Sequence, residues 1–217
     1  MNHSTPPRRH FWNDPVLLGG LALAYALFAF TFRGPRPRFW SRMTGLGLTL
    51  GSLALVAEPR LRRPRFGWSD LWLGLGSAGV LYVIFQIGDR LARWLLPQGA
   101  SQIDSIYQLR RLRSKPELAA RLMLVIGPAE ELFWHGFVEK RLIQRYGMIP
   151  GAALGTLFYG SVHLASGNLT LIGAASVAGA FWGALAALGV PLTALIVSHI
   201  AWDIIIFLVA PTQKMES

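Results

Sequence analysis

The chain of 217 residues contains no cysteine and has few charged side chains. The absence of cysteine excludes disulfide bonds, thiolate nucleophiles and thiolate metal ligands. Only 15% of the residues are charged and 53% are hydrophobic, whereas a soluble domain usually carries about 25% charged residues. Acidic residues are scarce, with 11 Asp and Glu against 21 Lys and Arg. This composition predicts an all-α fold, a polytopic transmembrane helix bundle.

The net charge of +10 arises largely from arginines in short loops between apolar runs, as in segments 33–42 and 60–65. Arginines in such loops are typical of contacts with anionic lipid headgroups and of topology control. We therefore expect the lipid bilayer as a partner and no nucleic acid, because no soluble module is present to bind it. No small-residue cleavage site follows the first apolar run, so we expect no cleavable leader.

Apolar runs long enough to cross a bilayer predict about seven spans in a single integral membrane domain, residues 1–217. Three spans lie in residues 15–96 and four form a core in residues 116–210. A short basic amphipathic helix, Gln102–Ser114, is predicted to lie on the membrane surface. The predicted spans are Pro15–Phe32, Trp40–Ala57, Trp68–Leu96, Pro116–Gly147, Pro150–Leu164, Leu169–Leu188 and Pro191–Ala210.

The fourth span is too long for one straight crossing and contains Gly127-Pro128. Proline removes a backbone donor and clashes with the preceding turn, so we expect a break or a kink there. The acidic pair Glu130 and Glu131 would then lie in the first turn of the inner half.

Ionisable side chains are rare in the last three predicted spans. Apart from Tyr159, residues 148–213 hold only His163, His199 and Asp203. Such groups inside a membrane are costly and usually functional. We therefore expect these groups and the Glu130–Glu131 pair to form one polar site.

The residue types in this set suit hydrolysis of an acyl bond. A carboxylate beside a histidine can hold and deprotonate water, and a second histidine can stabilise the oxyanion that forms. Glu131 and His135 are four residues apart, as are His199 and Asp203, so each pair shares a helix face.

Three motifs carry a resemblance to a known family. Glu130-Glu131-x-x-x-His135, Tyr159-x-x-x-His163 and His199-x-x-x-Asp203 occur in that order. Together they resemble the CPBP family, which includes C-a-a-X prenyl proteases, Abi proteins and bacteriocin-processing or self-immunity proteins. The resemblance covers about residues 115–207.

The resemblance implies a glutamate-dependent intramembrane endopeptidase acting on a membrane-anchored protein or peptide. It implies that Glu130 is the catalytic base, with His163 as its partner, and that His199 and Asp203 stabilise the oxyanion. Glu131 would be a supporting acid. Two positions depart from the family pattern: His135 stands where the family has Arg, and Tyr159 stands where it has Phe.

A zinc site is the main chemical alternative, with Glu130, His163 and His199 as ligands. The helical His-Glu-x-x-His signature is absent, and the family motif also works without metal, so we expect no cofactor. No serine-protease motif surrounds Ser161 or Ser198, and one buried Asp does not suit a two-Asp protease.

Two other function classes remain open at this point. The polar cluster could serve a non-catalytic protein, for bacteriocin self-immunity or as a scaffold, or it could serve a transporter or proton relay. If the protein is a protease, its substrate could be a prenylated tail, a leader peptide or a C-terminal sorting tail. The small size and the lack of a soluble domain favour a prokaryotic cell (inner) membrane.

Overall fold

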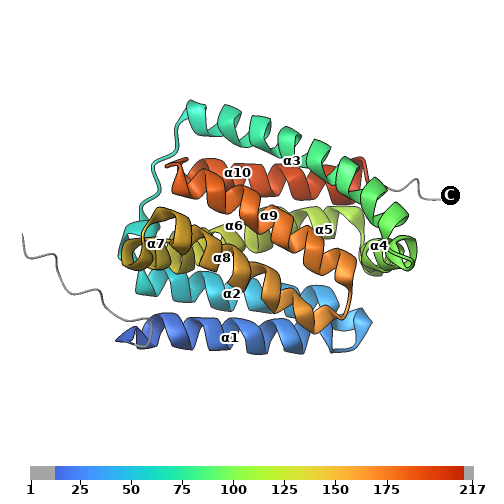
Figure 1. Ribbon diagram of the computed structural model, residues 1–217, viewed down its shortest axis with the longest axis horizontal. Helices are drawn as coiled ribbons and strands as arrows, with labels where there is room; N and C mark the ends of the chain where they lie inside the picture. The colour runs from blue at the N-terminus through green and yellow to red at the C-terminus, as the bar shows by residue number, and fades with distance from the viewer. Residues whose placement is uncertain (1–12, 213–217) are drawn as a thin grey trace, which may run out of the picture.

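A computed structural model describes residues 13–212, and this part of the chain is entirely helical apart from short connections (Figure 1). The predicted all-α fold is therefore confirmed for the described residues. The helices α1, α2, α3 and α10 run roughly parallel along the long axis of the bundle. The α-helices are α1 Pro15–Phe32, α2 Phe39–Ala57, α3 Trp68–Leu95, α4 Gly99–Gln108, α5 Lys115–Arg121, α6 Gly127–Glu131, α7 Lys140–Tyr146, α8 Met148–Val162, α9 Leu169–Ala187 and α10 Leu192–Asp203.

Four helical stretches are long and apolar enough to cross a membrane: Pro15–Phe32, Trp68–Leu95, Leu169–Ala187 and Leu192–Val209. Only a sixth to a third of their residues are buried inside the bundle. Large apolar side chains such as Phe30, 59% exposed, face outward from these helices. An outward apolar surface of this extent suits lipid rather than water, so the protein is an integral membrane protein.

The prediction of seven spans is confirmed for these four. Helix α8 has 15 residues, fewer than the roughly 17 that a bilayer core requires. Helix α2 has 19 residues but includes Arg42. The segment Pro116–Gly147 carries several charged residues. These three helical segments exist where the sequence predicted them, and their crossing of the membrane stays a prediction.

Of the break or kink predicted at Gly127-Pro128, the break is wrong, and the kink stays a prediction. The chain stays helical from Lys115 to Tyr146, with wide π-helical turns at Leu122–Ile126 and Leu132–Glu139. Immediately before Pro128, the Gly127 amide donates to the Leu122 carbonyl, five residues back. The wider turn accommodates the proline ring without ending the helix, since the ring would otherwise meet the carbonyl four residues earlier.

The apolar core lies where α1, α2 and the long 115–146 segment meet. Buried rings from that segment, among them Phe133, Trp134 and Phe137, pack against α1 and α2. Gly127 brings α6 close to α10, because a Cβ there would lie 3.2 Å from the Ile200 side chain. These contacts fix the depth at which Glu130 and Glu131 enter the bundle.

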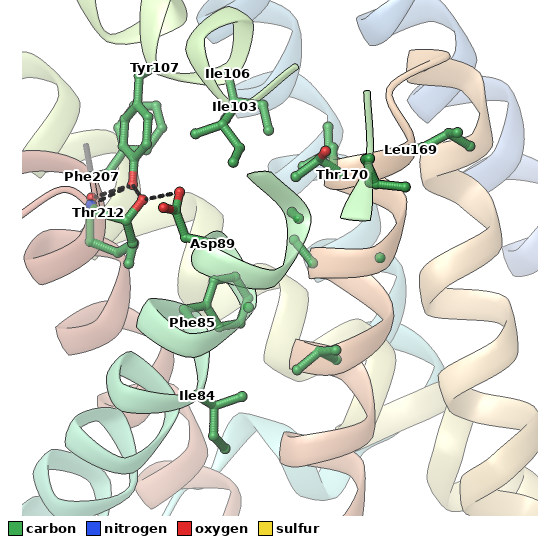
Figure 2. A pocket seen from close by; sticks show the side chains of 18 of the residues that line it. Ile84, Phe85, Asp89, Ile103, Ile106, Tyr107, Leu169, Thr170, Phe207 and Thr212 are labelled. Atoms are coloured by element: carbon green, nitrogen blue, oxygen red, sulfur yellow. Dashed lines mark hydrogen bonds between the residues drawn. The ribbon is translucent and has the colours of Figure 1, made fainter. Parts of the chain in front are cut away.

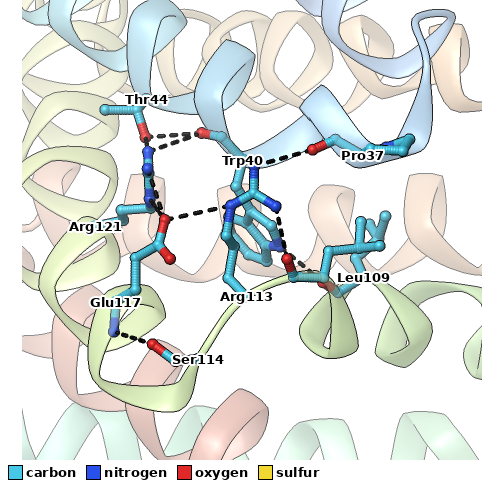
Figure 3. A network of polar contacts seen from close by, with 9 residues as sticks. Pro37, Trp40, Thr44, Leu109, Arg113, Ser114, Glu117 and Arg121 are labelled. Carbon is cyan, nitrogen blue, oxygen red and sulfur yellow. Dashed lines mark hydrogen bonds and ion pairs between the residues drawn. The ribbon is translucent and has the colours of Figure 1, made fainter.

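A polar network ties the start of this segment to α2 (Figure 3). Arg121 donates to Glu117 at 2.8 Å and to the Thr44 hydroxyl at 2.7 Å. Arg113, just before α5, pairs with Glu117 at 3.3 Å, and the Trp40 indole donates to the Leu109 carbonyl at 2.8 Å. The segment predicted as a surface helix, Gln102–Ser114, forms most of α4 and a 3-10 turn, Leu109–Leu112.

Candidate active site

The polar residues singled out in the sequence meet at one cavity. It has a volume of about 190 Å³, and its lining includes Glu130, His163, His199 and Asp203. Glu130 comes from α6, His163 from the turn after α8, and the other two from α10. The predicted convergence of these side chains is therefore seen in the structure, although their catalytic roles remain proposals.

Tyr159 connects Glu130 with His163. Its hydroxyl donates to Glu130 Oε2 at 2.7 Å, and its backbone carbonyl accepts from His163 Nδ1 at 2.9 Å. Since a carbonyl can only accept, Nδ1 of His163 carries the proton, and a neutral ring keeps its lone pair on Nε2. The tyrosine that departs from the family pattern thus fixes the carboxylate through its added hydroxyl.

Glu131 holds His199 from across the bundle. His199 Nδ1 donates to Glu131 Oε1 at 2.8 Å, and Glu131 is 1% exposed. The His199 ring also stacks on Trp182 of α9, with ring centroids 4.1 Å apart and planes at 17°. These two contacts fix the plane of the imidazole and leave Nε2 as its remaining polar atom.

Asp203 is the partner predicted for His199, and it lies beside His199 at a longer distance. His199 Nε2 and Asp203 Oδ2 are 3.7 Å apart, which is an ion-pair distance and too long for a hydrogen bond. Asp203 Oδ2 is buried and has no hydrogen-bond partner among residues 13–212. The closer acidic partner of His199 is therefore Glu131, which the sequence reasoning had assigned only a supporting role.

His135 makes its shortest contact with a residue that the sequence reasoning missed. His135 Nδ1 lies 2.6 Å from Glu139 Oε2, and Nε2 lies 3.9 Å from Glu131 Oε2. Glu139 is 1% exposed. Its spacing of four residues from His135 was a usable signal, because residues i and i+4 face each other on a helix. The stacking of Trp182 on His199 had no such signal in the sequence.

Helices outside the polar segments close the cavity. The Phe28 and Phe32 rings of α1 pack on His163, with centroids at 5.0 and 5.8 Å. Ser77 of α3 donates to Ser198 of α10 at 2.9 Å, and the Trp182 indole donates to the same hydroxyl at 3.0 Å. The Ser198 hydroxyl is therefore engaged by another serine and an indole in the contact between helices.

The alternative of a zinc site requires the side chains of Glu130, His163 and His199 to lie close enough together to bind one ion. In the described part of the chain, no three His, Cys, Asp or Glu side chains are grouped closely enough to hold a metal ion. Glu130, His163 and His199 line the same cavity but do not form such a group. The arrangement instead pairs each histidine with a carboxylate or a carbonyl.

A second cavity of about 340 Å³ adjoins the first (Figure 2). The two cavities share lining residues that include Phe85, Trp202 and Phe207. The second cavity, here termed the apolar chamber, lies between α3, α4, α9 and the end of α10, and its lining is mostly aliphatic and aromatic.

The rim of the apolar chamber is polar. The Thr212 hydroxyl donates to Asp89 at 2.8 Å, and the Thr212 amide donates to the Tyr107 hydroxyl at 3.2 Å (Figure 2). Burial raises the pKa of the Tyr107 phenol, so it stays protonated at neutral pH. Asp89, Tyr107 and Thr212 thus form a hydrogen-bonded polar group in the otherwise mostly apolar lining of the chamber.

Comparison with known proteins adds the family. Residues 114–205 match the family described as type II CAAX prenyl endopeptidase Rce1-like. No curated protein and no solved structure matches the chain. The matched residues contain all three motifs that carried the resemblance to the CPBP family, which is thereby confirmed. The segment from residue 114 to residue 205, with its cavity of paired histidines and carboxylates, belongs to the Rce1-like family of CAAX prenyl endopeptidases.

Proposed function

We propose that the protein is an intramembrane endopeptidase that hydrolyses a peptide bond in a membrane-anchored protein or peptide by water that Glu130 activates. One observation carries the proposal. Glu130, His163, His199 and Asp203, from three separate helical elements, line one cavity inside a bundle of apolar helices. A scaffold would need no such convergence, and a proton relay would need no apolar chamber beside it.

Glu130 is the general base in this mechanism. Its carboxylate accepts a proton from water while the water oxygen attacks the carbonyl carbon of the scissile peptide bond. The Tyr159 hydroxyl holds one carboxylate oxygen. The lone pair on His163 Nε2 orients the same water, since Nδ1 is committed to the Tyr159 carbonyl.

His199 stabilises the oxyanion that this attack produces. Nδ1 donates to Glu131, so an imidazolium ring held there can donate from Nε2 to the developing charge. When the tetrahedral intermediate collapses, the C–N bond breaks. Glu130 returns its proton to the leaving amine, which leaves a carboxylic acid and an amine, and the acid then releases the second proton of the water to the amine or to solvent. Asp203, 3.7 Å from Nε2, supports the charged ring.

The apolar chamber supports a substrate with a long apolar group next to the scissile bond. It shares lining residues with the cavity that holds Glu130, and its lining is mostly aliphatic and aromatic. Pockets of this kind bind apolar ligand surface and use a few polar groups to fix orientation. A prenylated tail, the substrate class in the description of the matched family, fits these requirements, and so does an apolar peptide tail.

The experiment compares purified wild-type protein with Glu130→Gln in lipid vesicles. Three quenched fluorescent peptides serve as probes: a prenylated C-a-a-X peptide, a leader peptide with an apolar segment and a C-terminal peptide with a transmembrane helix. We expect wild-type protein to cleave at least one probe and Glu130→Gln to lose about 10²- to 10⁴-fold in kcat.

Glu117→Gln is the matched control, because Glu117 lies in the same helical segment but is 38% exposed and pairs with Arg121. It should cleave as the wild type does. Wild-type protein that cleaves none of the probes would count against the endopeptidase, and undiminished cleavage by Glu130→Gln would remove the base from this mechanism. We further propose that the protein resides in a prokaryotic cell membrane, with residues 116–210 as its catalytic core.

A further inference from the structure

Behind the active-site cavity, a buried chain of alternating acids and histidines runs deeper into the bundle. His199 Nδ1 bonds to Glu131 Oε1 at 2.8 Å, the second oxygen of Glu131 lies 3.9 Å from His135 Nε2, and His135 Nδ1 bonds to Glu139 Oε2 at 2.6 Å. His135 and Glu139 are 6% and 1% exposed. Neither belongs to the cavity lining, so the mechanism above leaves both unused.

The surroundings of Glu139 make room for a carboxylate. Its carboxyl group lies where α8 and α9 cross, and both helices have glycine there. A Cβ on Gly183 would lie 2.8 Å from Glu139 Oε2, and a Cβ on Gly155 would lie 3.0 Å from Glu139 Cγ. Apolar side chains would fill this space at less cost than a buried acid. Packing alone therefore gives no reason for Glu139.

Three polar atoms of the chain lack hydrogen-bond partners within residues 13–212: Glu131 Oε2, His135 Nε2 and Glu139 Oε1. Two of them face each other across the 3.9 Å gap. Buried polar atoms left in this way are costly and call for an explanation. A gap of this size between an acid and an imidazole closes to a hydrogen bond with a small rotation of either side chain.

We propose that Glu139 is a positioning residue that acts through His135 on Glu131, and so sets the His199 imidazole for peptide hydrolysis; this rests on the proposed function. Glu139 fixes the His135 ring with Nε2 toward Glu131. His135 in turn balances the charge of Glu131, and both side chains are buried. Negative charge develops on the oxyanion beside the positively charged His199. Behind His199 follow the negative Glu131, the positive His135 and the negative Glu139, so each buried charge has an opposite charge next to it.

The proposed role of Glu139 also explains why a histidine can stand at position 135, where the family pattern has arginine. An arginine at position 135 would carry a permanent charge, whereas a histidine needs an acid to hold it charged. His135 and Glu139 together therefore take the place of one arginine. Among residues 13–212, the acids that lie against His135 are Glu139 at 2.6 Å and Glu131 at 3.9 Å, and the Tyr159 ring stacks on it at 6.3 Å.

The decisive experiment measures kcat and KM for Glu139→Gln and for the double variant His135→Arg/Glu139→Gln, with the vesicle assay and the best-cleaved probe. We expect Glu139→Gln to lose about 10- to 100-fold in kcat, as for other outer partners of functional groups, with KM nearly unchanged because the cavity lining is intact. The double variant should regain most of the lost kcat, because arginine stays charged without Glu139.

A second variant covers the case in which Glu139→Gln does not fold. Gly183→Ala keeps the carboxylate but moves it away from His135, and should also lower kcat. Gly76→Ala, on an exposed face of α3 with open space around its Cβ, is the control for the glycine change. Unfolding temperatures in detergent are measured for every variant.

A purely structural role would lower the unfolding temperature and would not be rescued by the added arginine, and that result would overturn the proposal. Wild-type kcat in Glu139→Gln would overturn it as well, and where Glu139→Gln does not fold, wild-type kcat in Gly183→Ala would do so. Glu130→Gln is run alongside. If it is inactive while Glu139→Gln is normal, only the positioning role fails. If no probe is cleaved by the wild type, the proposed function itself fails.

Discussion

The two halves of the described chain differ sharply in what they bury. From residue 13 to residue 112, the buried polar or charged side chains are Thr31 and Asp70. From residue 114 onward they are Glu130, Glu131, His135, Glu139, His163, Ser198 and His199. The family match covers the second half only. Yet the first half supplies the rings that pack on His163 and the helix that borders the apolar chamber.

The unequal distribution of buried polar side chains indicates separate roles for the two halves. The second half holds the groups that can bind, transfer or stabilise charge, and the first half encloses them and limits their contact with bulk solvent. Exclusion of water strengthens every electrostatic interaction inside such a site. Changes in the second half should therefore reduce catalysis and leave the fold intact, whereas changes in the first half should act through stability or through binding.

The largest expected effect is a pure loss of catalysis from the second half. His163→Ala should lower kcat by about 10²- to 10⁴-fold, because the activated water loses its second partner. Its unfolding temperature should stay close to the wild-type value. Ser161→Ala, two residues away, is the control and should remain active. An inactive Ser161→Ala beside an active His163→Ala would reverse the assignment of the nucleophile.

The next largest expected effect is a loss of stability caused by a substitution in the first half of the chain. Phe28 is fully buried and packs on His163, so Phe28→Ala should destabilise the protein by about 3 kcal/mol through the cavity it leaves. Equilibrium unfolding in detergent micelles measures this loss. At a temperature where the variant is still folded, we expect most of the activity to remain. A stable but inactive Phe28→Ala would give the first half a chemical role.

A smaller effect should separate binding from chemistry. Gly88 lines the apolar chamber and has open space around its Cβ, so Gly88→Phe places a ring in the chamber. We expect KM for a probe with a long apolar group to rise about tenfold, equivalent to about 1.4 kcal/mol of lost binding, with kcat little changed. Gly79→Phe, on the same helix and equally open but outside the chamber, is its control. Equal KM values for the two variants would exclude the chamber from substrate binding.

Asp203→Asn should have a mild effect although it lies in the second half. An amide retains the shape and a hydrogen-bonding oxygen near His199 Nε2, now 3.7 Å from the acid, so we expect kcat to fall by less than about tenfold. Comparison with Glu131→Gln, which removes the closer partner of His199, ranks the two acids. A larger loss in Asp203→Asn than in Glu131→Gln would make Asp203 the principal partner.

Removal of metal ions is expected to have no effect on peptide cleavage. Incubation with a strong chelator should leave cleavage unchanged, because the mechanism relies on a carboxylate base. Zinc added back is the control. Loss of activity on chelation, with recovery on adding zinc, would reassign Glu130, His163 and His199 as metal ligands.

Much of the fold could be predicted because apolar runs end at strong local signals. The first span begins at Pro15 and ends at Phe32 as predicted, since Asp14 caps its start and charged residues follow its end. The convergence of Glu130, His163, His199 and Asp203 at one cavity could be predicted because ionisable groups inside a membrane are few. The presence of Glu130, His163 and His199 in otherwise apolar spans was enough to predict that they lie close together.

The remaining features depend on contacts between distant segments. Glu131 rather than Asp203 is the closest partner of His199 because α6 and α10 pack tightly at Gly127, which sequence spacing does not encode. The π-helical turn before Pro128 is a compromise between the proline ring and continued packing on both sides. Local propensity predicts a break there, and tertiary contacts outweigh it.

The π-helical turns also bear on how this sequence can change over evolutionary time. A π turn amounts to one residue more than an α turn in the same stretch of helix. Loss of a single residue from Leu132–Glu139 would therefore let this stretch relax to α geometry while its two flanks kept their relative orientation. Loss of a residue from the α-helical turn Gly127–Glu131 would instead rotate one flank against the other by about 100°, and Glu130 and Glu131 could not both keep their partners on α8 and α10. One-residue deletions should therefore be tolerated better in the π-helical stretch than in the α-helical turn that precedes it.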